Sequence, residues 1–357
     1  MRKQVMFLTA AVALASGVAM AGPADWTYAG SFGSPSNFSP ATDHSIAAVR
    51  TAIDSTGKMY VAVTPGAGNR LVWSATAPTT SLTTPTYTLL ASTSYDNMAN
   101  GFQGISTDAA NNVYLTGDDG IGTGPAPLNG STIQKFDSTG AAVATFGTAG
   151  TVVYPNTAVR MTGNALFSNG NLLTVNVHGT TNTVFNSVTG TEIASWACAI
   201  GTFPRDVAIK QATDEIFVMK SGQIFKVTGG TAAAPTGYTT VVAWEFGGTP
   251  PAFNTSSQVK PSLTYFAKDD TLIHGNWDVA TGGTENSAYV VDASTGNVIQ
   301  VLAGIYRPGD CAVYTAGGVD YLYVLNGGVN TGTSDGVIQV YTKPTTPAAA
   351  VNEWSLY

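Results

Sequence analysis

Charged residues are scarce in this sequence: Asp, Glu, Lys and Arg together make up 10% of its 357 residues, about half the usual share. Lys and Arg number 15 against 22 Asp and Glu, which gives a net charge of -7. A chain with so little positive charge offers no basic field to the phosphates of nucleic acid, which we exclude as a partner. Because 44% of the residues are hydrophobic, intrinsic disorder is excluded as well.

Cysteines and long apolar runs are also few. Two cysteines cannot build a disulfide framework or a structural zinc site. Beyond residue 21 no stretch of 18 residues is continuously apolar, so we expect no integral membrane segment in the mature protein. Helical periodicity is nearly absent there; short β-branched and aromatic runs alternate instead and are separated by turn residues. This pattern favours an all-β fold.

The N-terminus is typical of a secretory signal peptide. Arg2 and Lys3 form a positive n-region, an apolar stretch follows over residues 5–15, and Ala19 and Ala21 frame a cleavage site. The sequence therefore predicts that residues 1–21 are removed near Ala21 and that the protein is secreted, in the periplasm or outside the cell.

An internal repeat with a period of about 53 residues is the strongest signal downstream. Residues 101–147 read as four strands: Gly-Phe-Gln-Gly-Ile-Ser-Thr-Asp, Asn-Asn-Val-Tyr-Leu-Thr, Ile-Gln-Lys-Phe-Asp-Ser-Thr-Gly and Val-Ala-Thr-Phe-Gly. This segment resembles a blade of an NHL-repeat β-propeller, including its turn at residues 137–140. Weaker copies have second strands that begin near Met59, Val113, Leu172, Ile216, Leu272 and Leu322. Fourth strands are expected around Phe146, Trp196 and Trp244.

The two ends of the repeat region fit one another. Residues 25–33 read as a fourth strand with no blade before it, and residues 337–341 as a third strand with none after it. Pairing them completes a sixth blade and removes two exposed edges, which a tandem of immunoglobulin-like sandwiches does not predict. The sequence thus predicts a six-bladed β-propeller over residues 22–343, closed by its N-terminal strand. Residues 344–357 read as a Pro/Ala-rich linker and a short aromatic tail, which packs on the propeller or docks to a partner.

Scarce cations gather at the starts of the predicted innermost strands. Aligning the copies places four of the five arginines beyond the signal peptide at one repeat position, with Lys and Gln in the other two copies. The set is Arg50, Gln103, Arg160, Arg205, Lys260 and Arg307. Guanidinium groups around a channel suit a carboxylate, sulfate or phosphate. The alternative interpretation is that each Arg pairs with a neighbouring acid, such as Asp54, Asp206 or Asp310, and braces adjacent blades.

A second set of polar residues marks the ends of the predicted second strands. Its candidate ligand-binding members are Asn176, Asn276 and Asn326. Asp118 belongs to it as well, and with His274 makes the candidate metal site. Oxygen ligands of this kind hold Ca²⁺ or another divalent cation, although Asn and Asp are also ordinary turn residues.

Three classes of function remain open from the sequence. The first is a secreted, non-catalytic propeller that binds an extracellular protein, a glycan or a small anionic ligand at its channel face. The second is a metal-dependent hydrolase, since the chain is also similar to gluconolactonase-type lactonases in its blade number; however, no Glu opens an inner strand as a metal ligand. A structural surface component that assembles through its tail is a third reading.

Overall fold

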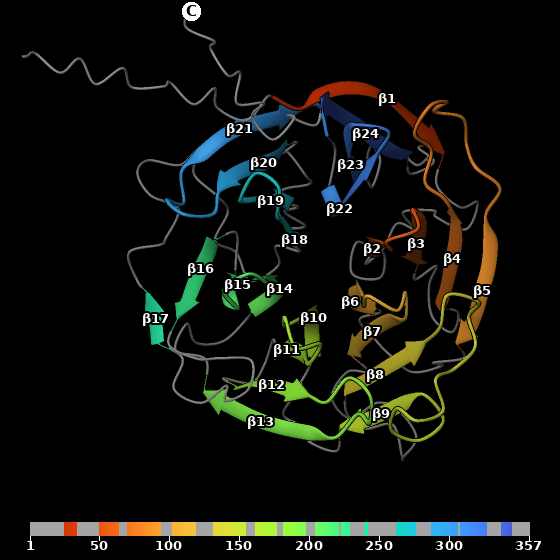
Figure 1. Cartoon of the computed structure of the whole chain (residues 1–357), viewed down its shortest axis with the longest axis vertical. Helices are drawn as coiled ribbons and strands as arrows, with labels where there is room; N and C mark the ends of the chain where they lie inside the picture. Colours follow the sequence, from red (N-terminus) through yellow and green to blue (C-terminus); the bar gives the residue numbers. More distant parts are fainter. Residues whose placement is uncertain are drawn as a thin grey trace, which may run out of the picture.

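The computed structural model describes residues 25–33, 50–63, 70–93, 102–118, 131–154, 161–176, 181–197, 204–220, 223–228, 239–241, 262–275, 287–305, 308–326 and 337–344. All regular structure in these ranges is β-strand, arranged as six four-stranded antiparallel sheets around one axis (Figure 1). The chain is therefore a six-bladed β-propeller, as its sequence predicts. No helix in the described ranges is long and apolar enough to cross a membrane.

The strands of each blade follow one another from the axis outward. Blade one consists of β2 (Arg50–Ile53), β3 (Lys58–Val63), β4 (Arg70–Thr76) and β5 (Thr88–Thr93). Blade two consists of β6 (Phe102–Thr107), β7 (Val113–Asp118), β8 (Ser131–Phe136) and β9 (Thr151–Tyr154). Blade three consists of β10 (Met161–Leu166), β11 (Leu172–Asn176), β12 (Thr181–Phe185) and β13 (Glu192–Ala197). Blade four consists of β14 (Pro204–Lys210), β15 (Glu215–Lys220), β16 (Gln223–Thr228) and β17 (Thr239–Val241). Blade five consists of β18 (Ser262–Phe266), β19 (Thr271–Gly275), β20 (Ser287–Asp292) and β21 (Val298–Ala303). Blade six consists of β22 (Pro308–Ala316), β23 (Val319–Asn326), β24 (Val337–Pro344) and β1 (Thr27–Gly33).

Blade six is closed by the two ends of the described chain. β1 runs antiparallel to β24, with Thr27 opposite Thr342 and Gly33 opposite Val337. Phe32 on β1 is buried and meets the ring of Tyr323 edge-on, 6.3 Å between centroids. The predicted closure by the N-terminal strand is therefore confirmed.

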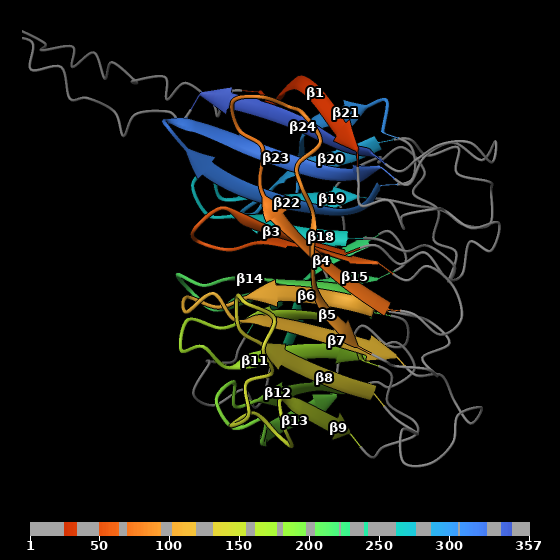
Figure 2. The same ribbon diagram turned by 90° about the vertical axis from the view of Figure 1, so that its right-hand side faces the viewer.

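Short-range turn chemistry repeats between the first and second strands. Asp54 Oδ1 accepts hydrogen bonds from the backbone N–H groups of Thr56 and Lys58, and the Tyr60 hydroxyl donates to Asp54 Oδ2. Asp108 and Tyr114 repeat the arrangement in blade two. In Figure 2 the turns that join β2 to β3 and β22 to β23 lie on one face of the disc, which we call the turn face.

One predicted strand is wrong. Phe146 lies in a run of turns between β8 and β9, and the fourth strand of blade two begins only at Thr151. Left-handed backbone at Gly147, with a φ of 57°, breaks the extended conformation there. The Phe146 ring is fully buried and packs edge-on against Tyr114, so its apolar character serves packing between blades. Trp196 lies in β13 as expected, whereas Trp244 lies outside the described residues.

The hydrophobic core lies between neighbouring blades. One cluster joins Phe167, Leu173 and Val175 of blade three to Val207 and Val218 of blade four. Equivalent clusters join the other described blade faces. Because each blade buries both faces, the innermost strands are held edge to edge around the axis and form the wall of a channel.

Candidate functional site: the central channel

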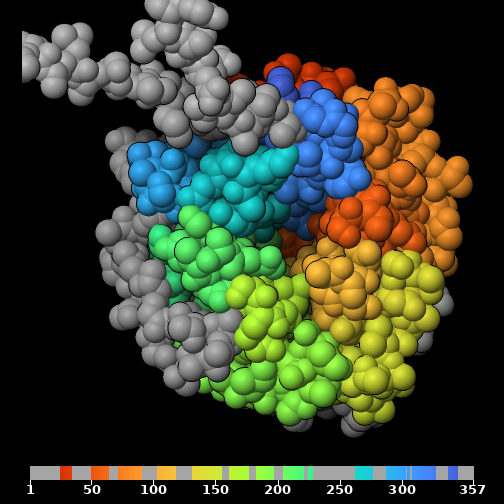
Figure 3. Space-filling model, viewed as in Figure 1, coloured from red at the N-terminus to blue at the C-terminus, as the bar shows by residue number. Residues whose placement is uncertain are grey.

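A cavity of about 260 Å³ lies on the axis and is lined by all six innermost strands. Each strand contributes one small side chain at its middle lining position: Ala52, Ser106, Ala165, Ala208, Thr264 and Ala312. These side chains keep the channel open beside the turns between first and second strands. Figure 3 shows a hollow at the centre of this face.

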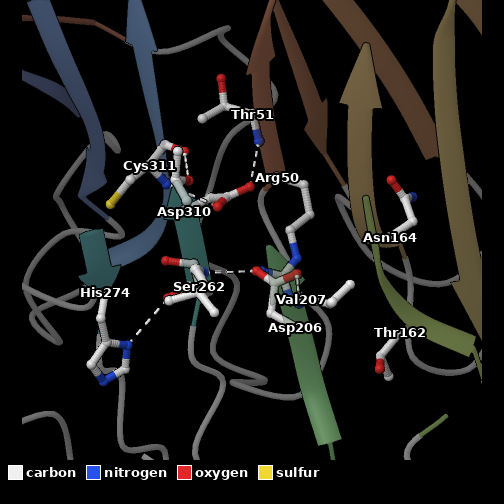
Figure 4. Close-up of polar contacts among 12 residues, drawn as sticks. Arg50, Thr51, Thr162, Asn164, Asp206, Val207, Ser262, His274, Asp310 and Cys311 are labelled. Carbon is white, nitrogen blue, oxygen red and sulfur yellow. Dashed lines mark hydrogen bonds and ion pairs between the residues drawn. The ribbon is translucent and has the colours of Figure 1, made fainter. Parts of the chain in front are cut away.

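An ion pair crosses the channel on one side of this cavity. Arg50 lies at the start of β2 in blade one, and Asp206 lies on β14 in blade four, on the opposite side of the ring (Figure 4). Arg50 Nη1 is 3.5 Å from Asp206 Oδ2, and the two side chains are only 5% and 10% exposed. Arg50 Nε is buried and has no hydrogen-bond partner among the described residues. These residues therefore satisfy the guanidinium only in part.

Asp206 and Asp310 make the same contacts in blades four and six. Asp206 accepts hydrogen bonds from the backbone N–H groups of Val207 and Leu263, each 2.9 Å long. Asp310 accepts them from Cys311 at 2.9 Å and from Thr51 at 2.8 Å. In each case one donor is the next residue and the other belongs to the innermost strand of the following blade. Each carboxyl thus ties two neighbouring blades together at the axis.

Burial determines the protonation of this pair. Desolvation raises the pKa of both Asp206 and Asp310, and it outweighs the attraction of Arg50, which lowers both. The charge of Asp206 raises the pKa of Asp310 further. One guanidinium therefore faces two carboxyl groups, and burial disfavours the ionised form of both.

Glycine makes room for the Asp206 carboxyl. A Cβ atom on Gly163 of β10 would lie 2.3 Å from Asp206 Oδ1 and 2.5 Å from its Cα atom. Next to it, the Thr162 hydroxyl donates to the Pro204 carbonyl oxygen at 3.1 Å. The innermost strands of blades three and four therefore approach closely because one residue lacks a side chain and its neighbour supplies a hydrogen bond.

The register of the strands changes the predicted ring of cations. Arg50 lies opposite Ala62, the fifth residue of β3, whereas the fifth residue of β15, Met219, lies opposite Asp206. The repeat position of Arg50 is therefore filled by Asp206 in blade four, and Arg205 precedes it by one residue. The expected equivalence of Arg50 and Arg205 is therefore wrong. β14 also bulges between Pro204 and Asp206, where Arg205 lies.

The remaining candidates of the first set are placed only in part. Gln103 is buried at the start of β6, and Arg205 is half-buried on β14. Arg160, Lys260 and Arg307 lie outside the described residues. The bracing interpretation holds for Arg50, although its partner is across the ring and not in the adjacent blade. Binding of an anion by this set stays a prediction.

The second set lies beside the first, as the strand order predicts. Asn176 ends β11 opposite Met161, and Asn326 ends β23 opposite Pro308; both side chains are buried. Asp118 ends β7, and Asn276 lies outside the described residues. The ends of the second strands therefore reach the starts of the innermost strands, at the other end of the channel from the turns.

His274 is fully buried in β19. Its Nδ1 donates to the Ser262 carbonyl oxygen at 3.2 Å, and its ring stacks on Tyr289 with 6.0 Å between centroids. Desolvation lowers the pKa of His274 to about 4, so the imidazole is neutral at pH 7. Among the residues described, no three His, Cys, Asp or Glu side chains gather as metal ligands. The metal role of Asp118 and His274 stays a prediction.

A sequence pattern marks Asp206 and Asp310, although the alignment of cations did not reveal it. Both carboxyls follow a proline by two residues where an innermost strand begins: Pro204-Arg-Asp206 and Pro308-Gly-Asp310. This shared pattern, and not the preceding Arg, marks the residues that meet at the axis.

Comparisons with known proteins bear on the fold. No protein-family model matches the sequence, and no curated protein matches it. Among solved structures, a catalytically inactive virginiamycin B lyase from Staphylococcus aureus with quinupristin superposes with a TM-score of 0.51, at 11% identity, over 91% of this chain and 90% of that chain. The Swd1 β-propeller domain from Myceliophteria thermophila gives a TM-score of 0.52, at 10% identity, over 89% and 99% of the two chains. At these identities the likeness shows the propeller fold alone.

Proposed function

We propose that this protein is a secreted, non-catalytic β-propeller that binds a small polar ligand in its central channel. The observation that carries the proposal is the cavity of about 260 Å³ lined by all six innermost strands. Ligand sites in proteins are typically concave and enclosed by several elements, with a few polar groups among apolar walls. Here the Ser106 hydroxyl lies among aliphatic side chains and has no hydrogen-bond partner among the described residues, whereas the hydroxyls of Thr51 and Thr264 donate to backbone carbonyl oxygens. Export rests on residues 1–21 alone.

The volume restricts the ligand to a molecule smaller than an ordinary drug. The described residues that line the cavity include no charged side chain, which favours a neutral ligand such as a monosaccharide. Small carboxylates are the competing class, because Arg50 precedes the lining residue Thr51 and its Nε has no hydrogen-bond partner among the described residues.

Titration calorimetry with monosaccharides, citrate, sulfate and phosphate tests the proposal. Ala52→Leu and Ser106→Leu each narrow the cavity, and we expect both to abolish the binding seen with the unmodified protein. Ala29→Leu makes the same change as Ala52→Leu on exposed β1 and serves as the matched control. A ligand that binds all three variants equally overturns the channel as its site.

The competing enzyme reading is tested on the same preparation. Metal analysis together with a screen for lactone and phosphoester hydrolysis separates the two functions. Stoichiometric metal and turnover that Ala52→Leu abolishes contradict the non-catalytic proposal, whereas binding without turnover supports it.

A further inference from the structure

A lysine and an aspartate from neighbouring blades form a buried ion pair. Lys343 precedes the last residue of β24 in blade six, and Asp269 lies in the turn between β18 and β19 of blade five. Lys343 Nζ contacts Asp269 Oδ2, and the two side chains are only 3% and 12% exposed. Blades five and six are neighbours in the ring (Figure 1). The pair therefore joins the blade that closes the propeller to the blade before it.

Two aromatic rings flank the Lys343 ammonium. Nζ lies 4.6 Å from the ring centroid of Trp26 and 4.9 Å from that of Phe266. Both rings belong to the hydrophobic cluster between blades five and six. Rings of this kind attract a cation, but they also exclude the water that stabilises a charge. Desolvation is the larger effect here, and with the nearby charge of Lys268 it lowers the pKa of Lys343 to about 8.

The Asp269 carboxylate receives little support as an ion. Apart from Lys343, Asp269 Oδ2 has no partner among the described residues. The Lys135–Asp108 pair of blade two is different, since Nζ and Oδ2 are 3.7 Å apart and Asp108 accepts hydrogen bonds from two backbone N–H groups and two side chains. Hydrogen bonds to a carboxylate favour its ionised form. At Asp269 Oδ2, by contrast, the described residues oppose transfer of a proton from lysine much less.

A second ion pair holds the Asp269 turn against blade six. Asp320 lies opposite Lys343 in the pairing of β23 with β24. Its Oδ1 accepts hydrogen bonds from Lys268 Nζ at 2.8 Å and from the Thr315 hydroxyl at 2.6 Å. Because Lys268 precedes Asp269 in the chain, this contact positions the Asp269 carboxyl beside Lys343. Two groups held in this way react with an effective concentration on the order of 10⁵–10⁸ M when they are well oriented.

We propose that Lys343 and Asp269 condense to an isopeptide bond, which joins blades five and six covalently. A proton first moves from Nζ to the carboxylate, so that the ion pair becomes an amine and a carboxylic acid. The amine then attacks Cγ of Asp269 and forms the C–N bond. One carboxyl oxygen takes a proton from the nitrogen, its bond to Cγ breaks, and it leaves as water. The products are one amide and one water, and no oxidant or other reactant is required.

Burial favours the amide over the ion pair. The ion pair keeps two charges in an apolar cluster, whereas the amide is neutral. The same cluster limits the access of water, which the reverse reaction needs. The bond fixes β24, whose pairing with β1 closes the ring, to the preceding blade. Closure of the propeller then no longer depends on non-covalent contacts alone.

Mass spectrometry of the purified and denatured protein tests the proposal, once its N-terminus has been determined. We expect the wild-type protein to be lighter than its sequence by the mass of one water, and Lys343→Arg to show its full sequence mass. The matched control is Lys135→Arg, because the Lys135 side chain is also buried, at 7% exposed, and contacts a carboxylate. This control should still lose one water.

A peptide map locates the bond. Chymotrypsin cleaves at aromatic residues, several of which lie between positions 269 and 343. We expect the wild-type protein to yield one branched peptide that contains both positions, and Asp269→Ala to yield none. The wild-type result decides the question even if a variant does not fold.

Two results overturn the proposal. One is a wild-type protein that is folded by circular dichroism, shows its full sequence mass and yields no branched peptide; Lys343 and Asp269 are then an ion pair only. The other is a loss of water that persists in Lys343→Arg, which assigns the loss to other residues.

Discussion

The side chains of Arg50 and Asp206 meet across the central channel, Nη1 to Oδ2 at 3.5 Å, although 156 residues and three blades separate them. Asp310 joins the same group from blade six, since its pKa responds to both Arg50 and Asp206. The contact is not a surface ion pair, because both partners are almost fully buried. It ties opposite sides of the ring.

Removing the cation should destabilise the ring. Arg50→Met leaves two buried carboxyls without a counter-charge, and we expect a loss of about 3–5 kcal/mol in the free energy of unfolding. Chemical denaturation measures it. Adding Asp206→Leu to Arg50→Met removes one of the orphaned acids and should restore part of the loss. A single variant as stable as the unmodified protein contradicts a structural role for the pair.

The stability of the protein should depend on pH through the acidic pair. Because the folded-state pKa values of Asp206 and Asp310 are raised, the folded protein binds more protons than the unfolded chain between about pH 4 and neutrality. Over that window the free energy of unfolding therefore falls as the pH rises. Denaturation at a series of pH values measures the slope.

His274 contributes the opposite slope and provides the control. Its folded-state pKa is lowered to about 4, so stability rises with pH from there to its ordinary range near about 6.5. In the variant with both Asp206→Asn and Asp310→Asn, the free energy of unfolding should no longer fall as the pH rises. The increase with pH that His274 causes should remain. If the free energy of unfolding of this variant still falls as the pH rises, other groups cause the pH dependence.

Blades three and four approach each other so closely at Gly163 that we expect no side chain to be tolerated at this position. Gly163→Ala places Cβ within 2.5 Å of the Asp206 Cα atom, and we expect a loss of about 1–3 kcal/mol from overpacking. Gly33→Ala is the matched control, since the nearest atoms to its Cβ all belong to the Thr84 side chain, with Oγ1 at 3.0 Å, and include no backbone atom. Thermal unfolding compares the two; equal melting temperatures speak against a tight contact at the axis.

Closure of the ring should depend on the inward side chain of β1. Phe32→Ala removes a ring that is 3% exposed within the cluster between blades six and one, so we expect a loss of about 3–5 kcal/mol. Tyr28→Ala, on the same strand but 53% exposed, should cost far less. Urea denaturation distinguishes them, and similar midpoints for both variants refute the role of Phe32 in closure.

Most of the fold could be predicted from local patterns. The starts of the second strands at Met59, Val113 and Leu172 agree with the observed strands to within one residue, because a buried middle strand requires a continuous apolar run. The missed strand at Phe146 shows the limit of this reasoning. An aromatic residue can pack equally well from a strand or from a turn. Only the tertiary structure, in which the Phe146 ring contacts Tyr114, shows that Phe146 packs from a turn.

The candidate site was predicted less completely. The sequence indicated the right region, the starts of the innermost strands, and named Asp206 and Asp310 among the acids that could brace the arginines. It could not show that Asp206, and not Arg205, occupies the register position of Arg50. The pairing of the first strand with the second strand decides which residue this is, and an alignment of strand starts does not contain that register.

The sequence by itself determined a closed ring of six sheets, because repeats of alternating residues bury both faces of each blade and the two ends supply complementary strands. Only the tertiary structure decided which side chains meet at the axis. Arg50, Asp206 and Asp310 come from three different blades, and their contact depends on the register of each innermost strand and on the space left by Gly163. A shift of one residue reverses the direction of a side chain, and the packing of the whole ring fixes that shift.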